Sequence, residues 1–229
     1  MTRNLCLWLC YTVSGICDGV HDTMLIHRIW LGGLTILALV VGLFSLRFVG
    51  VFLHRLPDVD VGIQAVIERV PGRALTHMLI APLALVSGPF QFFPGLRSRH
   101  PRIHRWTGRL YVSACVVAGI AALATTPYAS GGPIAGFGFA VLAIFWVSTT
   151  VGAWQAALRR NFGLHRLLMR YSYALTFAAV TLRLQIPIGI ALGFRAYSPL
   201  SVWLAYTSWI PNVILVALYS WRYGEKLRT

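Results

Sequence analysis

The chain has 229 residues, of which 57% are hydrophobic and only 11% are charged. A soluble domain carries roughly 25% charged residues, so this composition excludes an ordinary soluble protein and indicates an integral membrane protein. The net charge of +14 comes largely from arginines in short loops between apolar segments, and this distribution argues against nucleic acid as a partner.

The first residues, 1–23, combine Arg3 with an apolar run that is too short to cross a bilayer. The run resembles the core of a signal peptide, but no clear small-residue cleavage site follows it. We therefore expect an unprocessed interfacial segment, or an over-long start with Met24 as the true initiator. The remainder, 24–229, is predicted to be a single transmembrane helical domain. The four cysteines show the spacing of neither a disulfide framework nor a zinc site.

Six apolar segments of about 20 residues follow, and this is the length of helix that crosses roughly 30 Å of hydrocarbon. They predict an all-α integral membrane protein, a bundle of about six transmembrane helices. The predicted spans are 28–53, 74–95, 104–127, 135–158, 166–193 and 200–222.

The loops between these spans alternate in charge. Five arginines lie in 97–109 and four in 159–170, and neither loop has an acidic residue, whereas 128–134 has no charge and 194–199 has a single arginine. Because positively charged loops stay in the cytoplasm, we predict a multi-pass protein of the bacterial cytoplasmic (inner) membrane with both termini inside.

The same motif, His-Arg-x-x-x-Arg, opens the third and the fifth predicted span. Its two copies begin 61 residues apart, and a tyrosine follows each, so we predict an internal repeat of one helix pair. Such a repeat would bring two imidazoles and four guanidinium groups to one side of the membrane, where ionisable groups indicate function. The copies and their tyrosines are His104, Arg105, Arg109 and Tyr111, and His165, Arg166, Arg170 and Tyr173.

Two histidines on neighbouring helices are the ligands that a b-type haem needs inside a bundle. We therefore predict bis-histidine haem ligation by His104 and His165, and a second site at the outer ends of the first two spans with His77 and His54. The motif arginines would neutralise the haem propionates, and Tyr111, Tyr173 and Arg183 complete the candidate cofactor-binding set. This hypothesis describes an electron-transfer protein whose partner is a quinone or a larger membrane complex.

Other functions fit the same residues. Histidines at helix ends are often interfacial, and arginines in cytoplasmic loops occur in any membrane protein. Helix N-termini favour anions, and both motifs begin helices. The alternative is thus a cofactor-free membrane subunit or a bundle that binds anions or lipid headgroups, and an anion transporter also stays open. No catalytic residue can be named, so enzymatic activity is left undecided.

Arg183 stands inside the fifth span, 18 residues after His165. This separation is five whole turns and about 27 Å of a straight helix, so the two side chains are predicted to point the same way. No carboxylate occurs in the six spans, and Arg183 must find backbone carbonyls, Asn212, Gln185, a lipid phosphate or an anionic ligand.

Prolines interrupt three spans, and the backbone carbonyls that they free need other donors. Asn212, beside Pro211, is a candidate donor of this kind.

Several stretches together resemble a known family. Over about residues 75–215 the chain is similar to the bacterial integral membrane proteins grouped as domain of unknown function 2306. The resemblance implies a multi-helix bundle and no established activity. It rests on Gly88-Pro89-Phe90-Gln91-Phe92, Arg99-His100-Pro101, His104-Arg105-Trp106-x-Gly108-Arg109-x-Tyr111, Trp146, His165-Arg166-x-x-Met169-Arg170 and the run 173–183.

Overall fold

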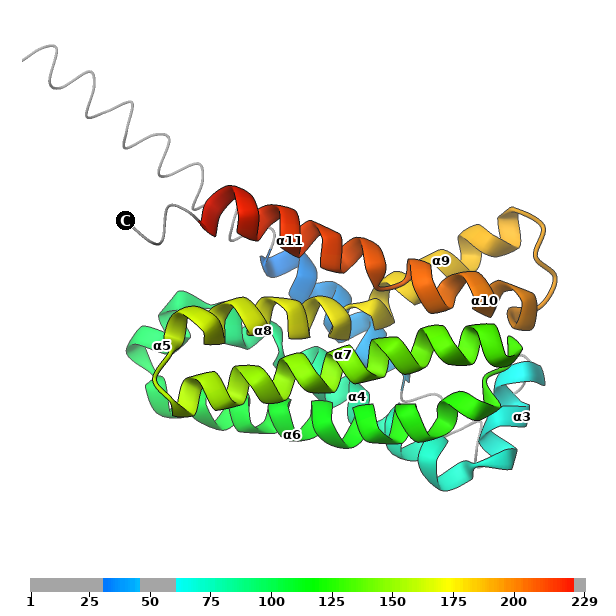
Figure 1. The fold of residues 1–229 in the computed structure, drawn as a ribbon, viewed down its shortest axis with the longest axis horizontal. Helices are drawn as coiled ribbons and strands as arrows, with labels where there is room; N and C mark the ends of the chain where they lie inside the picture. Colours follow the sequence, from blue (N-terminus) through cyan, green and yellow to red (C-terminus); the bar gives the residue numbers. More distant parts are fainter. Residues whose placement is uncertain (1–30, 46–60, 225–229) are drawn as a thin grey trace, which may run out of the picture.

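The protein is described by a computed structural model, which covers residues 31–45 and 61–224 (Figure 1). Residues 1–30, and with them the predicted segment 1–23, lie outside the described part, as does His54. The described residues form helices and short turns, with no strand among them. In chain order the helices are Leu31–Ser45, α3 (Val61–Arg69), α4 (Pro71–Ser87), η1 (Pro89–Phe92), α5 (Pro94–Arg99), α6 (Pro101–Thr125), η2 (Thr126–Tyr128), α7 (Gly132–Leu158), α8 (Phe162–Thr176), α9 (Ala178–Ala191), α10 (Tyr197–Thr207) and α11 (Ile210–Gly224).

Five of the predicted spans are confirmed as helical segments long and apolar enough to cross a membrane. They are Pro71–Phe92, Pro101–Tyr128, Gly132–Leu158, Phe162–Ala191 and Tyr197–Arg222.

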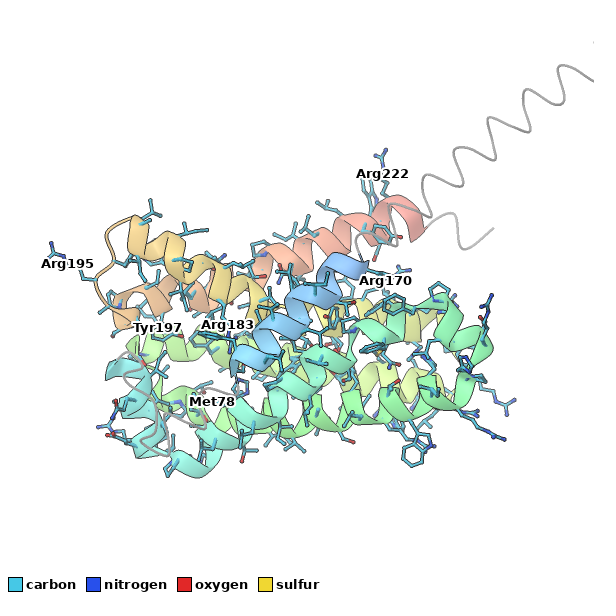
Figure 2. The ribbon with its side chains drawn as sticks, turned by 180° about the vertical axis from the view of Figure 1, so that it is seen from behind. Met78, Arg170, Arg183, Arg195, Tyr197 and Arg222 are labelled. Carbon is cyan, nitrogen blue, oxygen red and sulfur yellow. The ribbon has the colours of Figure 1, made fainter. Side chains whose placement is uncertain are left out.

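The first predicted span, 28–53, is not confirmed. Within it the structure describes the apolar helix Leu31–Ser45, which is shorter than the roughly 20 residues that a straight span needs. This helix lies diagonally across one face of the bundle (blue in Figure 2).

The helices α4, α6, α7 and α8 form the central bundle. α4 pairs with α6 and α7 pairs with α8, and each pair turns back at the same end of the molecule (Figure 1). α10 and α11 pack against α7 and α8 from one side. Small residues let the central helices approach closely, as in many membrane bundles: Ala84, Ala118 and Ala153 are fully buried. The two antiparallel pairs are compatible with the predicted repeat, which remains a prediction.

The predicted fifth helix is interrupted at Phe177, where α8 ends and α9 begins. Arg183 therefore lies on a different helix from His165, and the five-turn count does not fix their relative directions. Residue-by-residue periodicity assumes a straight helix, and Phe177, which is not a proline or a glycine, signals no break in the sequence.

Polar side chains join the interrupted spans. Asn212 donates from α11 to the backbone oxygen of Ala174 at 3.2 Å and to the hydroxyl of Thr181 at 3.0 Å, so it serves a carbonyl at the interruption after α8 rather than one freed by a proline. Pro211 has no N–H to offer the oxygen of Thr207 one turn earlier. Gln185 supplies that donor at 3.1 Å.

Arginines gather at one end of the bundle, which we call the basic end. It comprises α5, the first turns of α6 and α8, the turn between α7 and α8, and the end of α11 (Figure 1). In Figure 2, Arg170 and Arg222 lie toward this end and Arg195 projects from the other. The arginines of the basic end are Arg97, Arg99, Arg102, Arg105, Arg109, Arg159, Arg160, Arg166, Arg170 and Arg222.

Candidate functional site

The two motif histidines begin α6 and α8, both at the basic end. His165 holds its Nδ1 2.9 Å from the backbone oxygen of Ala153 on α7. Because a carbonyl oxygen only accepts, Nδ1 carries the proton in this hydrogen bond. The Nδ1 atom of His104 is buried and has no hydrogen-bond partner in the described part of the chain.

Two turns farther along, the interior between α6 and α8 is closed by a hydrogen-bonded cluster. The hydroxyl of Tyr111 lies 2.8 Å from that of Ser172 and 2.9 Å from that of Thr176. The indole N–H of Trp146 donates to Thr176 at 2.8 Å, and Thr150 bonds Ser172 at 2.6 Å. These five residues, the Tyr111 cluster, are buried and join α6, α7 and α8.

The packing of the described residues does not support the predicted haem between His104 and His165. The Tyr111 cluster lies seven residues beyond each histidine, which is about 10 Å along the helix. Met169, only one turn beyond His165, is buried in the same interior. A haem ring extending from the histidines along this interior would meet these side chains, Met169 first. His77 lies in the other half of the bundle, and its predicted partner His54 is outside the described residues.

Tyr173, the tyrosine that follows the second copy of the motif, packs against other aromatic side chains. The ring of Tyr173 contacts Phe92, Tyr111 and Phe177, with ring centroids 5.5 to 6.5 Å apart. Its face also covers Gly88, where a Cβ atom would overlap the ring. The end of α4 at Gly88 therefore packs directly against Tyr173 of α8.

The arginines of the two copies are placed differently. Arg105 and Arg109 line a surface cleft of about 360 Å³ on α6, together with Arg102 and Trp106. The guanidinium carbon of Arg109 lies 5.1 Å from the centre of the Trp106 ring. Arg166 does not line this cleft. Arg170 instead stacks over Tyr219 of α11 at 5.3 Å.

A cavity of about 360 Å³ lies in the half of the bundle away from the basic end. The helix Leu31–Ser45 and helices α3, α4, η2 and α6 to α10 contribute residues to its walls, most of them apolar. Met78, Arg183 and Tyr197 line it and are labelled together in Figure 2.

Arg183 brings a positive charge to this cavity. Its Nη1 donates to the backbone oxygen of Ala179 at 2.8 Å and its Nη2 to the hydroxyl of Ser45 at 3.1 Å. These bonds use two of the five N–H donors of a guanidinium group. Glu68 is the only acidic side chain among the described residues, and it accepts a hydrogen bond from Gln64 on its own helix, α3.

Two further polar side chains line the cavity. His77 lines the cavity and donates from Nδ1 to the backbone oxygen of Ala118 at 3.0 Å. Ser208 is fully buried, and its hydroxyl has no partner in the described part of the chain. The sequence reasoning missed Ser208 and Ser45, because a serine in an apolar span is usually a packing residue. Pro211, three residues after Ser208, was the only sequence signal nearby.

Five helices of spanning length around a packed interior define a multi-pass helical membrane protein. A family model described as "Predicted membrane protein (DUF2306)" matches residues 74–220, more than half of the chain, and the chain belongs to this family. The match confirms the resemblance seen in the sequence. Neither the comparison with curated proteins nor that with solved structures gives a match.

Proposed function

We propose that this membrane protein binds an anionic amphiphile inside the bilayer, in the cavity beside Arg183. The observation that carries the proposal is a guanidinium group that lines an intramembrane cavity and meets no described carboxylate there. An arginine at the centre of a membrane helix costs about 2.5 to 3.5 kcal/mol on insertion scales. An anion held by Arg183 would offset that cost.

The cavity has the chemistry of an amphiphile site. Its volume of about 360 Å³ is near the lower end of the range of ligand pockets, roughly 300 to 1,000 Å³, which favours a single acyl chain over two. Apolar walls suit the chain, and Arg183 with the unpartnered hydroxyl of Ser208 suits a carboxylate or phosphate head. A neutral quinone would fill the volume but leave the charge of Arg183 unbalanced.

The position of the cavity supports the same proposal. Leu175, Thr176 and Ala178 border the interruption of α8 and α9 and line the cavity, and Ser208 lies between α10 and α11. Discontinuous membrane helices often form binding sites, because their interrupted turns expose polar backbone groups only where these line a cavity. Transport of the anion stays open as an extension of this function.

The test measures ligand binding to the purified protein in mild detergent, with native mass spectrometry as the readout. Palmitate and a lysophosphatidate are the anionic probes, and a monoacylglycerol is the neutral one. We expect Arg183→Gln to weaken binding of the anions about tenfold or more, since a hydrogen bond to a charged group contributes roughly 1.5 to 3 kcal/mol.

Arg195→Gln is the matched control. It removes the same charge from an exposed position in the turn between α9 and α10, outside the cavity lining, and should bind like the original chain. Equal binding of palmitate by Arg183→Gln and the original chain would contradict the proposal. So would equal affinity for palmitate and the monoacylglycerol.

A further inference from the structure

The cleft on α6 lies at the opposite end of the molecule from the cavity and does not depend on it. Arg102, Arg105 and Arg109 line it, spaced i, i+3 and i+7, which places them on one side of the helix. Trp106 stands among them and is 68% exposed. From these residues we infer that the cleft is a binding site for the headgroup of an acidic phospholipid.

The charges of the cleft call for an anion. Its three guanidinium groups are exposed, and the only described acidic side chain, Glu68, is on α3 at the other end. The planar fork of arginine donates two parallel hydrogen bonds to one phosphate, which a lysine cannot do. Arg109 is further held over the ring of Trp106, which restricts its orientation before a ligand arrives.

The surface beside the cleft identifies the anion as a lipid. Along α6 from the cleft toward the middle of the span, the exposed side chains become aliphatic: Leu110, Val117 and Ile120 are about half exposed. The cleft thus lies where the outer face of α6 changes from arginine to hydrocarbon, the depth at which exposed tryptophans occur in membrane proteins. A headgroup in the cleft would have its acyl chains along this aliphatic face.

The experiment measures lipid retention by the full chain, using native mass spectrometry with phosphatidylglycerol and phosphatidylcholine as probes. The test variant is R102Q/R105Q/R109Q. The matched control, R159Q/R160Q/R166Q, removes three arginines from the same basic end but from outside the cleft lining. We expect the test variant to retain phosphatidylglycerol about tenfold more weakly than the control, with phosphatidylcholine retention unchanged.

A second variant keeps the net charge, so it keeps the inference testable if the glutamine variant fails to insert or fold. R102K/R105K/R109K loses only the planar forks, and we expect it to hold phosphatidylglycerol several-fold more weakly than the original chain does. Retention equal to that of the original chain would overturn the inference. Equal weakening in the two glutamine variants would also overturn it, because it would show a diffuse effect of positive charge.

Inorganic phosphate separates a lipid site from a site for a free anion. Phosphate is added at millimolar concentration, and a parallel sample receives chloride at the same ionic strength. Phosphatidylglycerol should stay bound in both, because its acyl chains contribute to its affinity. Complete displacement by phosphate, but not by chloride, would overturn the assignment to a lipid.

Discussion

Tyr111 and Arg183 both carry polar groups into the helix bundle, but their hydrogen bonds differ. The Tyr111 hydroxyl has two partners, Ser172 and Thr176, and the residue is fully buried. Arg183 has two partners but more donors than these bonds use, and it lines a cavity. A satisfied buried group stabilises a fold, whereas a charged group with spare donors is available to a ligand.

Replacing Tyr111 by Phe should therefore affect stability. The change removes two hydrogen bonds and leaves the ring in place, and such bonds inside membrane proteins average about 0.6 kcal/mol each. We expect a loss of about 1 kcal/mol in the free energy of unfolding, measured by titration with a denaturing detergent. Tyr128→Phe, at a partly exposed tyrosine in η2 with no described side-chain hydrogen bond, is the control and should change little. Equal losses in the two variants would contradict a structural role for the Tyr111 cluster.

Close contact between helices determines which residue is needed at particular positions, and Gly88 is one of them. The end of α4 meets α8 at Gly88, which is covered by the ring of Tyr173. That ring is itself held by Phe92 and Phe177, and its hydroxyl lies 3.4 Å from the backbone oxygen of Leu85. The ring cannot move aside without disturbing three neighbours, so the contact between α4 and α8 requires a residue without a side chain.

Gly88→Ala tests this contact. Its methyl group would overlap the Tyr173 ring, and overpacking of this kind typically costs about 1 to 3 kcal/mol. We expect a lower melting temperature in detergent, read from the loss of helical circular dichroism on heating. Gly95→Ala is the matched control, because a Cβ atom there meets nothing within 4 Å. An unchanged melting temperature for Gly88→Ala would show that α4 and α8 separate easily.

At the scale of the whole molecule, the two ends of the bundle differ in charge and in shape. The basic end carries the motif arginines and the cleft on α6, and the other half encloses the cavity with Arg183 and His77. The positive-inside rule favours a cytoplasmic location for the basic end and for the C-terminus, as the loop charges predict. The cavity would then lie in the outer half of the membrane.

The visible spectrum of the purified protein tests the haem prediction. Because the interior just beyond His104 and His165 is packed with Met169 and the Tyr111 cluster, we expect protein from haem-replete cells to show no sharp bands after reduction with dithionite. Reduced b-type bands with at least one haem per chain would contradict this expectation. Their loss in His104→Ala and His165→Ala would then assign the ligands and restore the electron-transfer hypothesis.

Much of the fold follows from local properties of the chain. Apolar length predicts the five confirmed spans, and the arginine-rich loops predict that two turns lie at the same end. The placing of His104 and His165 at that end follows from the same alternation. The proline argument correctly predicts that the carbonyl freed by Pro211 needs a side-chain donor, but that donor is Gln185 and not Asn212. The spans and the loop charges depend on residues close together in sequence.

The sequence by itself determined the class of the protein, its family, the alternation of its spans and the candidate polar residues. Only the tertiary structure decided which of these residues meet. It packed the interior beyond the two motif histidines with the Tyr111 cluster, separated the arginines of the two copies, and brought Ser45 and Ser208 to the cavity of Arg183. The reason is physical: the hydrophobicity of local stretches determines which segments span the membrane, and the charge of the loops determines on which side of the membrane they lie. Cavities and hydrogen-bond partners depend on how helices rotate and bend against one another, and the interruption at Phe177 has no local signal.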